Sequence, residues 1–76
     1  MKNKFSIGEM ATLHGINITT LRYYHKIGLF KPAEIEENSN YRYYTIDQFE
    51  KLNMINYLKY LGISLQEINS ILDKRN

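Results

Sequence analysis

The feature that most constrains the fold of this chain is a helix-start pattern that the sequence repeats. In this pattern a serine or threonine caps the helix, a glutamate or glutamine stands three residues later, and apolar residues flank the group. The two polar side chains can each bond the other residue's backbone N–H, and the two apolar side chains can pack together as a staple. We therefore predict that a helix begins after each of three caps, in the segments Ser6 to Glu9, Thr45 to Gln48, and Ser64 to Glu67.

A fourth helix start is predicted at Asn17, a residue type that is common at the N-cap. It has apolar flanks but lacks the acid three residues later. Glycine, which reaches positive φ readily, follows three of the helical stretches, at residues 15, 28 and 62. These signals predict helices at about residues 7–14, 18–27, 46–61 and 65–74. The four staple pairs are Phe5 with Met10, Ile16 with Leu21, Tyr44 with Phe49, and Ile63 with Ile68.

The segment between the second and third helices predicts a β-hairpin. Pro32 excludes a helix here because proline lacks the backbone N–H. Two short runs, at residues 29–35 and 41–44, flank the turn-prone stretch EENSN, and the second run is rich in tyrosine, a good strand former. The first two helices, joined by HGIN, form a helix-turn-helix, on which this hairpin would be a wing. The predicted fold class is mainly α with a small β-hairpin, a winged helix-turn-helix with four helices.

Composition and spacing narrow the function classes. The 76 residues allow one domain, with the helix-turn-helix at about 7–27, the wing at 29–44 and a helix pair at 46–74. The chain has no cysteine, and no apolar run approaches the ~20 residues that span a bilayer, so we expect a cytoplasmic protein without membrane contact. His14 and His25 have no ligand-spaced partner, and no catalytic triad or glycine-rich phosphate loop stands out. We therefore expect the protein to bind no metal and no cofactor, and to have no enzymatic activity.

The helix at 18–27 has two distinct sides on a wheel of about 100° per residue. Leu21 marks the core side, with Ile18, His25 and Tyr24 nearest to it, and we expect the ring of Tyr24 to pack while its hydroxyl reaches outward. The opposite side carries no acid, which favours a DNA-binding face over an ordinary solvated one. The residues on that side are Thr19, Arg22, Tyr23 and Lys26.

The tripeptide Arg-Tyr-Tyr of this helix recurs in the predicted wing. Strand alternation puts Tyr41 and Tyr43 on one face, and Arg42 on the other beside the staple residue Tyr44. Arg42 could then reach a phosphate or a minor groove next to the recognition helix.

The helix at 46–61 is apolar on nearly all sides, a pattern typical of a buried helix. A domain this small cannot bury it completely. We expect one stripe to pack on the first two helices and another on the fourth helix, or on a segment or dimer partner outside this chain.

Three segments closely resemble the N-terminal DNA-binding domain of MerR-type transcriptional regulators, most of all the multidrug-responsive branch. They are FSIGEMATLHGINITTLRYYHKIGLFKP, YRYYT and LKYLGISLQEI, and the resemblance covers about residues 5 to 72. It implies a bacterial homodimer in which the second helix pair acts as a further wing. It also implies a palindromic promoter that is bent and untwisted so that RNA polymerase can engage it, which is readout by deformation.

The resemblance also implies roles for individual residues. Arg22 and Tyr23 match contacts of the recognition helix, and Arg42 matches the wing arginine. Tyr24 and Lys59 match a clamp on the DNA backbone, and for Lys59 the resemblance is the sole argument. Family members continue into a coiled coil and an effector domain where this chain stops at LDKRN. We therefore expect this chain to be weakly dimeric or monomeric, either as a DNA-binding fragment or as a small stand-alone protein.

Two alternatives stay open at this point. One is a small excisionase-like architectural protein that binds DNA. The other is a protein-interaction module that uses the apolar stripe of the helix at 46–61 and binds no nucleic acid.

Overall fold

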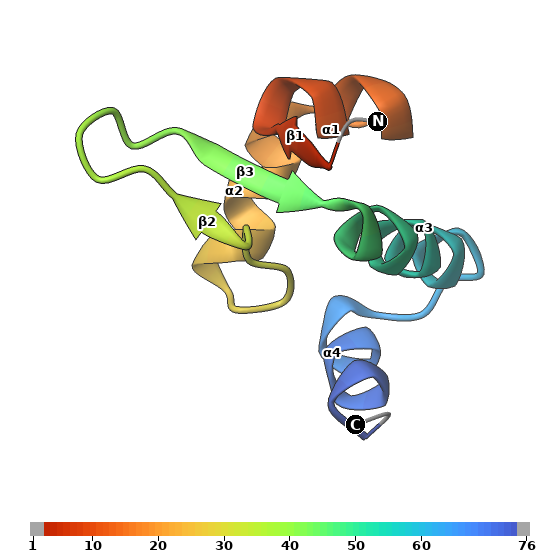
Figure 1. Cartoon of the computed structure of the whole chain (residues 1–76). Coiled ribbons are helices and arrows are strands. Elements are labelled where there is room, and N and C mark those ends of the chain that lie inside the picture. The colour runs from red at the N-terminus through yellow and green to blue at the C-terminus, as the bar shows by residue number, and fades with distance from the viewer. Residues whose placement is uncertain (1–2, 75–76) are drawn as a thin grey trace.

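The computed structural model describes residues 3–74 as four helices and a small antiparallel sheet (Figure 1). The predicted fold class, mainly α with a β-hairpin, is confirmed. None of the described helices is long and apolar enough to cross a bilayer. The elements are β1 (Lys4–Ser6), α1 (Ile7–His14), α2 (Ile18–Lys26), β2 (Glu34–Ile35), β3 (Arg42–Thr45), α3 (Ile46–Tyr60) and α4 (Leu65–Lys74).

All four helices begin where the sequence predicts, and α2 and α3 end one residue earlier than predicted. The glycines after α1, α2 and α3 have φ of 65°, 77° and 89°, which confirms their predicted role as helix stops. At the end of α3 the N–H of Gly62 donates to the carbonyl of Lys59 at 2.9 Å, and that of Ile63 donates to Leu58 at 3.1 Å. The left-handed turn thus satisfies carbonyls that the helix end leaves without helical partners.

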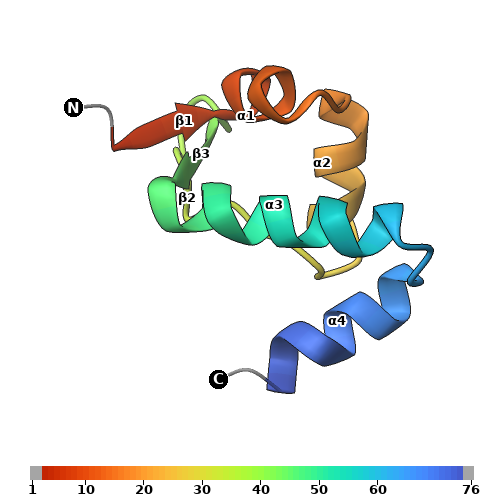
Figure 2. The same ribbon diagram turned by 90° about the vertical axis from the view of Figure 1, so that its right-hand side faces the viewer.

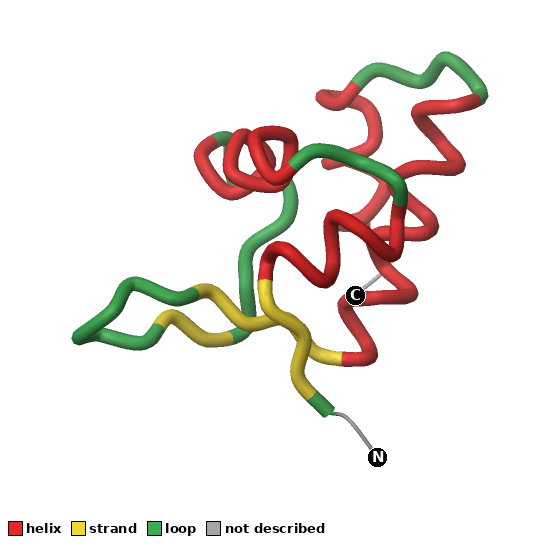
Figure 3. Tube along the Cα trace, turned by 90° about the horizontal axis from the view of Figure 1, so that it is seen from above, coloured by secondary structure: helices red, strands yellow, loops and turns green. Residues whose placement is uncertain are grey.

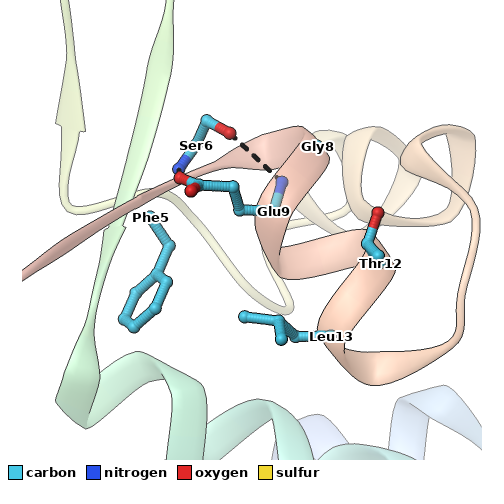
Figure 4. Close-up of a pocket in the computed structure, with 6 residues that line it drawn as sticks. All are labelled: Phe5, Ser6, Gly8, Glu9, Thr12 and Leu13. Carbon is cyan, nitrogen blue, oxygen red and sulfur yellow. Dashed lines mark hydrogen bonds between the residues drawn. The ribbon is translucent and has the colours of Figure 1, made fainter. Parts of the chain in front are cut away.

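Two of the three predicted capping boxes are complete. The N–H of Glu9 donates to the Ser6 hydroxyl at 3.1 Å, and the N–H of Ser6 donates to the Glu9 carboxylate at 2.9 Å (Figure 4). At α3, the Gln48 N–H donates to the Thr45 hydroxyl at 3.4 Å, and the Thr45 N–H donates to the Gln48 side chain at 3.1 Å. In each box, two backbone N–H groups that have no helical partner donate to side-chain oxygens, so they do not depend on water for a hydrogen bond.

The other two helix starts differ from the prediction in their side-chain bonds. At α4 the Glu67 N–H donates to the Ser64 hydroxyl at 3.1 Å, but that hydroxyl itself donates to the Glu67 carboxylate at 3.3 Å. The carboxylate is thereby engaged by the hydroxyl proton, and the reciprocal backbone bond of a full box is not formed. At α2, Asn17 has the extended backbone of an N-cap, but its side chain makes no capping bond. Helix α2 is started by backbone bonds alone.

The hydrophobic core is built around the predicted staples. Met10, Leu21, Tyr44 and Ile68 are fully buried, and their four staple partners pack against the same core. Burying a side chain of this size stabilises a fold by roughly 1.5–3 kcal/mol. Each helix start therefore also supplies two side chains to the core, which couples local structure to packing.

The sheet contains a strand that the sequence analysis missed. Strand β1 pairs with β3, and the register places Phe5 opposite Tyr44. The order of strands is β1-β3-β2, so β3 is central. Three residues are too short to show alternation, and β1 forms because the staple residue Phe5 brings its backbone alongside β3.

The predicted wing is present, but its first strand is shorter than expected. Of the predicted run at 29–35, Glu34–Ile35 alone pair with β3, whereas Leu29 and Phe30 are buried in the core. The N–H groups of these two residues donate to the Tyr24 carbonyl at 2.9 and 3.2 Å, so they close α2 instead of extending the hairpin. The side chain of Gln48 then accepts from the Ala33 N–H at 3.1 Å and donates to the Lys31 carbonyl, which ties the base of the wing to α3.

Three of the helices, α1, α3 and α4, lie one beyond another, and α2 runs crosswise beside them (Figure 2). Figure 2 shows α1 and α4 on opposite sides of α3, and Figure 3 shows the hairpin projecting away from the helices. Leu52 and Ile55 of α3 are fully buried, which confirms the predicted core stripe. The second apolar stripe is not covered by α4 in this structure. Five apolar or aromatic side chains of α3 and its C-cap remain exposed: Ile46, Met54, Tyr57, Tyr60 and Leu61.

Candidate nucleic-acid interface

The outward side of α2 is exposed as the helical wheel predicts. Tyr23 is half-exposed at 50%, whereas Leu21 on the opposite side is fully buried. Ile18, which the wheel places on the core side, is 37% exposed at the start of the helix. The side carries two cations, a phenol and a hydroxyl, and no acid stands anywhere in α2. Its four exposed residues are Thr19, Arg22, Tyr23 and Lys26.

Tyr24 lies in the core rather than at its edge. It is 1% exposed, and its hydroxyl is enclosed without a hydrogen-bond partner among the described residues. The expectation that this hydroxyl reaches outward is therefore wrong for this structure. The ring belongs to the hydrophobic core that also contains Leu52 and Ile55 of α3, and the Nζ of Lys59 lies 5.6 Å from the ring centre. A cation at this distance from an aromatic ring is attracted by the negative face of the ring.

The structure thus brings together Tyr24 and Lys59, which come from two different helices. Lys59 itself is exposed and lies over a buried phenol. No periodicity in the sequence could have indicated this contact, because it depends on how α3 crosses α2.

Arg42 links the wing to α2. Its Nε donates to Nδ1 of His25 at 3.4 Å, and the side chain is half-buried. Burial raises the pKa of Tyr44, and the charge of Arg42 on the same face of the strand opposes that rise. Tyr41 and Tyr43 face the other way, with ring centres 6.4 Å apart in an edge-to-face contact. The predicted alternation along β3 is confirmed, and Arg42 lies beside α2.

The opposite face of the wing has a different electrostatic character. Lys4 of β1 forms an ion pair with Glu34 of β2 at 2.6 Å, and its Nζ lies 5.9 Å from the centre of the Tyr43 ring. The hydrogen bond and charge of Glu34 raise the pKa of Lys4. Lys4 is thereby paired within the protein, whereas Arg42 lies on the side of the strand that faces α2.

Two other places were candidates for chemistry. His14 lies between backbone carbonyls, with Nδ1 2.9 Å from the Met10 oxygen and Nε2 3.1 Å from the Phe49 oxygen. Among residues 3–74, no three histidine, aspartate or glutamate side chains gather closely enough to hold a metal ion. An open hollow lies on α1 and β1, and its lining carries no cation (Figure 4). The lining residues are Phe5, Ser6, Gly8, Glu9, Thr12 and Leu13.

Comparison with known sequences gives one consistent result. Residues 5–75 match the family model of the MerR HTH family regulatory protein. The chain is 46% identical over 69 residues to the multidrug-efflux transporter 1 regulator of Bacillus subtilis (strain 168), covering 91% of this chain and 25% of the relative. It is 39% identical over 69 residues to the mercuric resistance operon regulatory protein of Bacillus cereus, covering 91% of this chain and 52% of the relative. The chain thus spans only a quarter to a half of these relatives.

Comparison with solved structures agrees. A cryo-EM structure of an EcmrR–DNA complex in EcmrR-RPo superposes with a TM-score of 0.88 at 39% identity, covering 95% of this chain and 27% of that chain. The crystal structure of a MerR-family transcriptional regulator from Bacillus cereus gives a TM-score of 0.87 at 37% identity, covering 96% of this chain and 54% of that chain. The relatives are regulators by name and not enzymes, and these matches favour neither the excisionase-like reading nor an interaction module without DNA.

Proposed function

The chain belongs to the MerR family of helix-turn-helix regulatory proteins, and from this premise we propose that it binds double-stranded DNA sequence-specifically to regulate transcription. The observation that carries the proposal is the exposed, acid-free side of α2, with Arg42 beside it and Lys59 nearby. A continuous cationic and aromatic surface on the second helix of a helix-turn-helix suits the major groove.

In this proposal, α2 reads bases and phosphates. Arg22 can bond the O6 and N7 atoms of guanine with two parallel hydrogen bonds from its planar guanidinium. Tyr23 and Lys26 suit phosphate oxygens, and Thr19 at the start of the helix can donate to a phosphate or a base. Base contacts give the specificity, and phosphate contacts set the register of the helix in the groove.

The wing and the pair of Tyr24 and Lys59 hold the DNA backbone on either side of α2. Arg42 would bond a phosphate or enter the minor groove. Lys59 would bond a phosphate, and its departure from the Tyr24 ring would expose the phenol hydroxyl for a second bond to the same strand. The enclosed, unpaired hydroxyl supports this step, because a buried hydroxyl without a partner gains a hydrogen bond on contact with phosphate.

The proposed mode of regulation is deformation of a palindromic promoter by a homodimer. Bending and untwisting would bring two promoter elements into a relation that RNA polymerase can engage, so the polymerase is an indirect partner. The exposed apolar stripe of α3 supports association with further protein, since such stripes are usually covered. We propose that this chain dimerises weakly and that the protein acts in the cytoplasm.

Mutation of Arg22 provides the direct test. A binding site is first selected by this protein from a random-sequence duplex library, and affinity is then measured by fluorescence anisotropy on the selected and on an unrelated 30-bp duplex. Arg22→Ala should abolish the preference for the selected site and leave the circular dichroism spectrum unchanged. Lys59→Ala should weaken binding to both duplexes alike and reduce the slope of log affinity against log salt by about 0.9, as expected for one phosphate contact.

The matched control is Lys51→Ala, which removes an exposed lysine of α3 that lies outside the candidate interface. It should change neither the site preference nor the salt slope. Loss of helicity in Arg22→Ala would instead make Arg22 a structural residue. Equal salt slopes for Lys59→Ala and the unmodified protein would contradict the backbone contact.

A further inference from the structure

We infer that His25 is a positioning residue for DNA binding, because its imidazole holds Arg42 of the wing in place beside the recognition helix. The inference rests on the proposed function, in which Arg42 contacts the DNA backbone. The observation that carries it is the hydrogen bond from Arg42 Nε to His25 Nδ1 at 3.4 Å, which joins two residues 17 positions apart. Within residues 3–74, it is the one side-chain hydrogen bond that links α2 to β3.

The bond uses the Nε donor of Arg42, which is not required for a two-bond contact between the terminal nitrogens and a phosphate. A guanidinium carries five N–H donors, one on Nε and four on the two terminal nitrogens. The terminal nitrogens form the fork that matches a phosphate with two parallel bonds. Because His25 binds Nε, the contact orients the guanidinium and leaves its terminal donors available to DNA. Nδ1 of His25 must act as the acceptor, so the proton of the neutral ring lies on Nε2.

Because His25 belongs to α2, its bond to Arg42 sets the position of the wing relative to this helix. His25 stands one helical turn after Arg22, so the two side chains are carried by the same rigid element. The bond between Arg42 and His25 therefore fixes the position of the wing arginine relative to Arg22, the arginine proposed to read bases. Without the bond, Arg42 would depend on the hairpin, whose remaining ties to the body lie mainly at its base, through β1 and Gln48. The tip of the hairpin, at residues 36–41, is exposed throughout.

Orientation before binding raises affinity. A long arginine side chain loses rotamer freedom when it binds phosphate, and that loss opposes binding. A side chain that is already held loses less. Arg42 is half-buried, and its charge acts on the buried Tyr44 two residues along the strand, so its surroundings restrict it as well as its hydrogen bond to His25.

Two substitutions separate the hydrogen bond from simple packing of the ring. His25→Leu keeps an apolar side chain of similar bulk but has no acceptor. His25→Asn loses the ring but places an amide oxygen on Cγ, where Nδ1 is attached. If the acceptor matters, Asn should bind DNA better than Leu; if ring packing matters, Leu should bind better than Asn.

The experiment measures affinity for a fluorescein-labelled random-sequence 30-bp duplex over a series of salt concentrations, since the wing contact is to the backbone. Arg42→Ala should weaken binding about tenfold, as expected for a bond between charged groups. His25→Leu should weaken it about fivefold, in the range of one net hydrogen bond, with the salt slope unchanged because the charge of Arg42 remains. His25→Asn should bind within about twofold of the unmodified protein. In the Arg42→Ala background, His25→Leu should add less than about 1.5-fold, because coupled residues are not additive.

Three results would overturn the inference. They are unchanged binding by His25→Leu, weaker binding by Asn than by Leu, or an undiminished effect of His25→Leu when Arg42 is already absent. Urea unfolding of each variant shows whether weaker DNA binding results from a loss of folding stability or from a lost contact. A normal affinity of Arg42→Ala would refute the proposed wing contact itself, and an unchanged preference of Arg22→Ala for the selected duplex would refute the proposed sequence-specific function.

Discussion

Replacing Tyr24 with phenylalanine should make the folded domain more stable and at the same time weaken its binding to DNA. The Tyr24 hydroxyl is buried without a partner among the described residues. A buried polar group in this state costs about 1–3 kcal/mol. Phenylalanine keeps the ring that packs in the core and lies under Lys59, so the substitution removes the cost and creates no cavity.

The magnitude can be set against a matched variant, Tyr44→Phe, because Tyr44 buries a second unpaired hydroxyl. Each substitution should raise the free energy of unfolding by about 1 kcal/mol, the lower end of that cost. In a domain of this size, such a change raises Tm by about 4–8 °C. The two variants should therefore be alike in stability.

The two variants should differ in DNA binding. Tyr24 is a proposed backbone contact and Tyr44 is not, so only Tyr24→Phe should lose affinity. The expected loss is about three- to tenfold, the effect of one net hydrogen bond. Stability is measured by urea unfolding followed by circular dichroism, and affinity by fluorescence anisotropy on one 30-bp duplex at fixed salt.

The outcome that refutes the reasoning is specific for each part. Lower stability in both variants would mean that the hydroxyls have partners in the folded protein. Equal affinity of Tyr24→Phe and Tyr44→Phe would mean that the Tyr24 hydroxyl never reaches DNA and that Lys59 does not uncover it.

Further predictions concern local structure and pH. Ser6→Ala should lower the free energy of unfolding by about 1 kcal/mol, and Ser64→Ala by less, because the box at Ser6 is complete and that at Ser64 is not; equal losses in urea unfolding would contradict this. Gly8→Ala should stabilise α1 by about 0.5–1 kcal/mol, since the added Cβ would meet its nearest neighbours at 3.8 and 3.9 Å. Gly62→Ala should destabilise by about 1 kcal/mol, because the residue has φ of 89°; stabilisation by both would contradict the role of positive φ. Burial raises the pKa of Tyr44 above its ordinary value of 10.0, so the unfolded state loses this proton at lower pH than the folded state. Stability is then full below about pH 10 and falls as pH rises through the folded pKa, and Tyr44→Phe should reduce this fall in a pH series of thermal unfolding.

Most of the secondary structure followed from the sequence because its signals are local. A capping box spans four residues, a glycine stop involves one positive φ, and the strand alternation of Arg42 and Tyr43 needs only neighbouring positions. Local reasoning failed where a neighbour from elsewhere intervened. Leu29 and Phe30 closed α2 in place of extending the hairpin, and β1 formed only because β3 was available to pair with it.

In the candidate site, too, some features follow from local sequence and others depend on tertiary contacts. The outward direction of Arg22, Tyr23 and Lys26 is a consequence of helical periodicity, which the residue order alone determines. The enclosure of Tyr24 under Lys59 and the bond between Arg42 and His25 are not, because each joins elements that lie far apart in the chain. Such contacts depend on the crossing of α2 with α3 and on the pairing of β3 with its neighbours. Those arrangements result from the packing of many core side chains at once, so no single stretch of sequence encodes them.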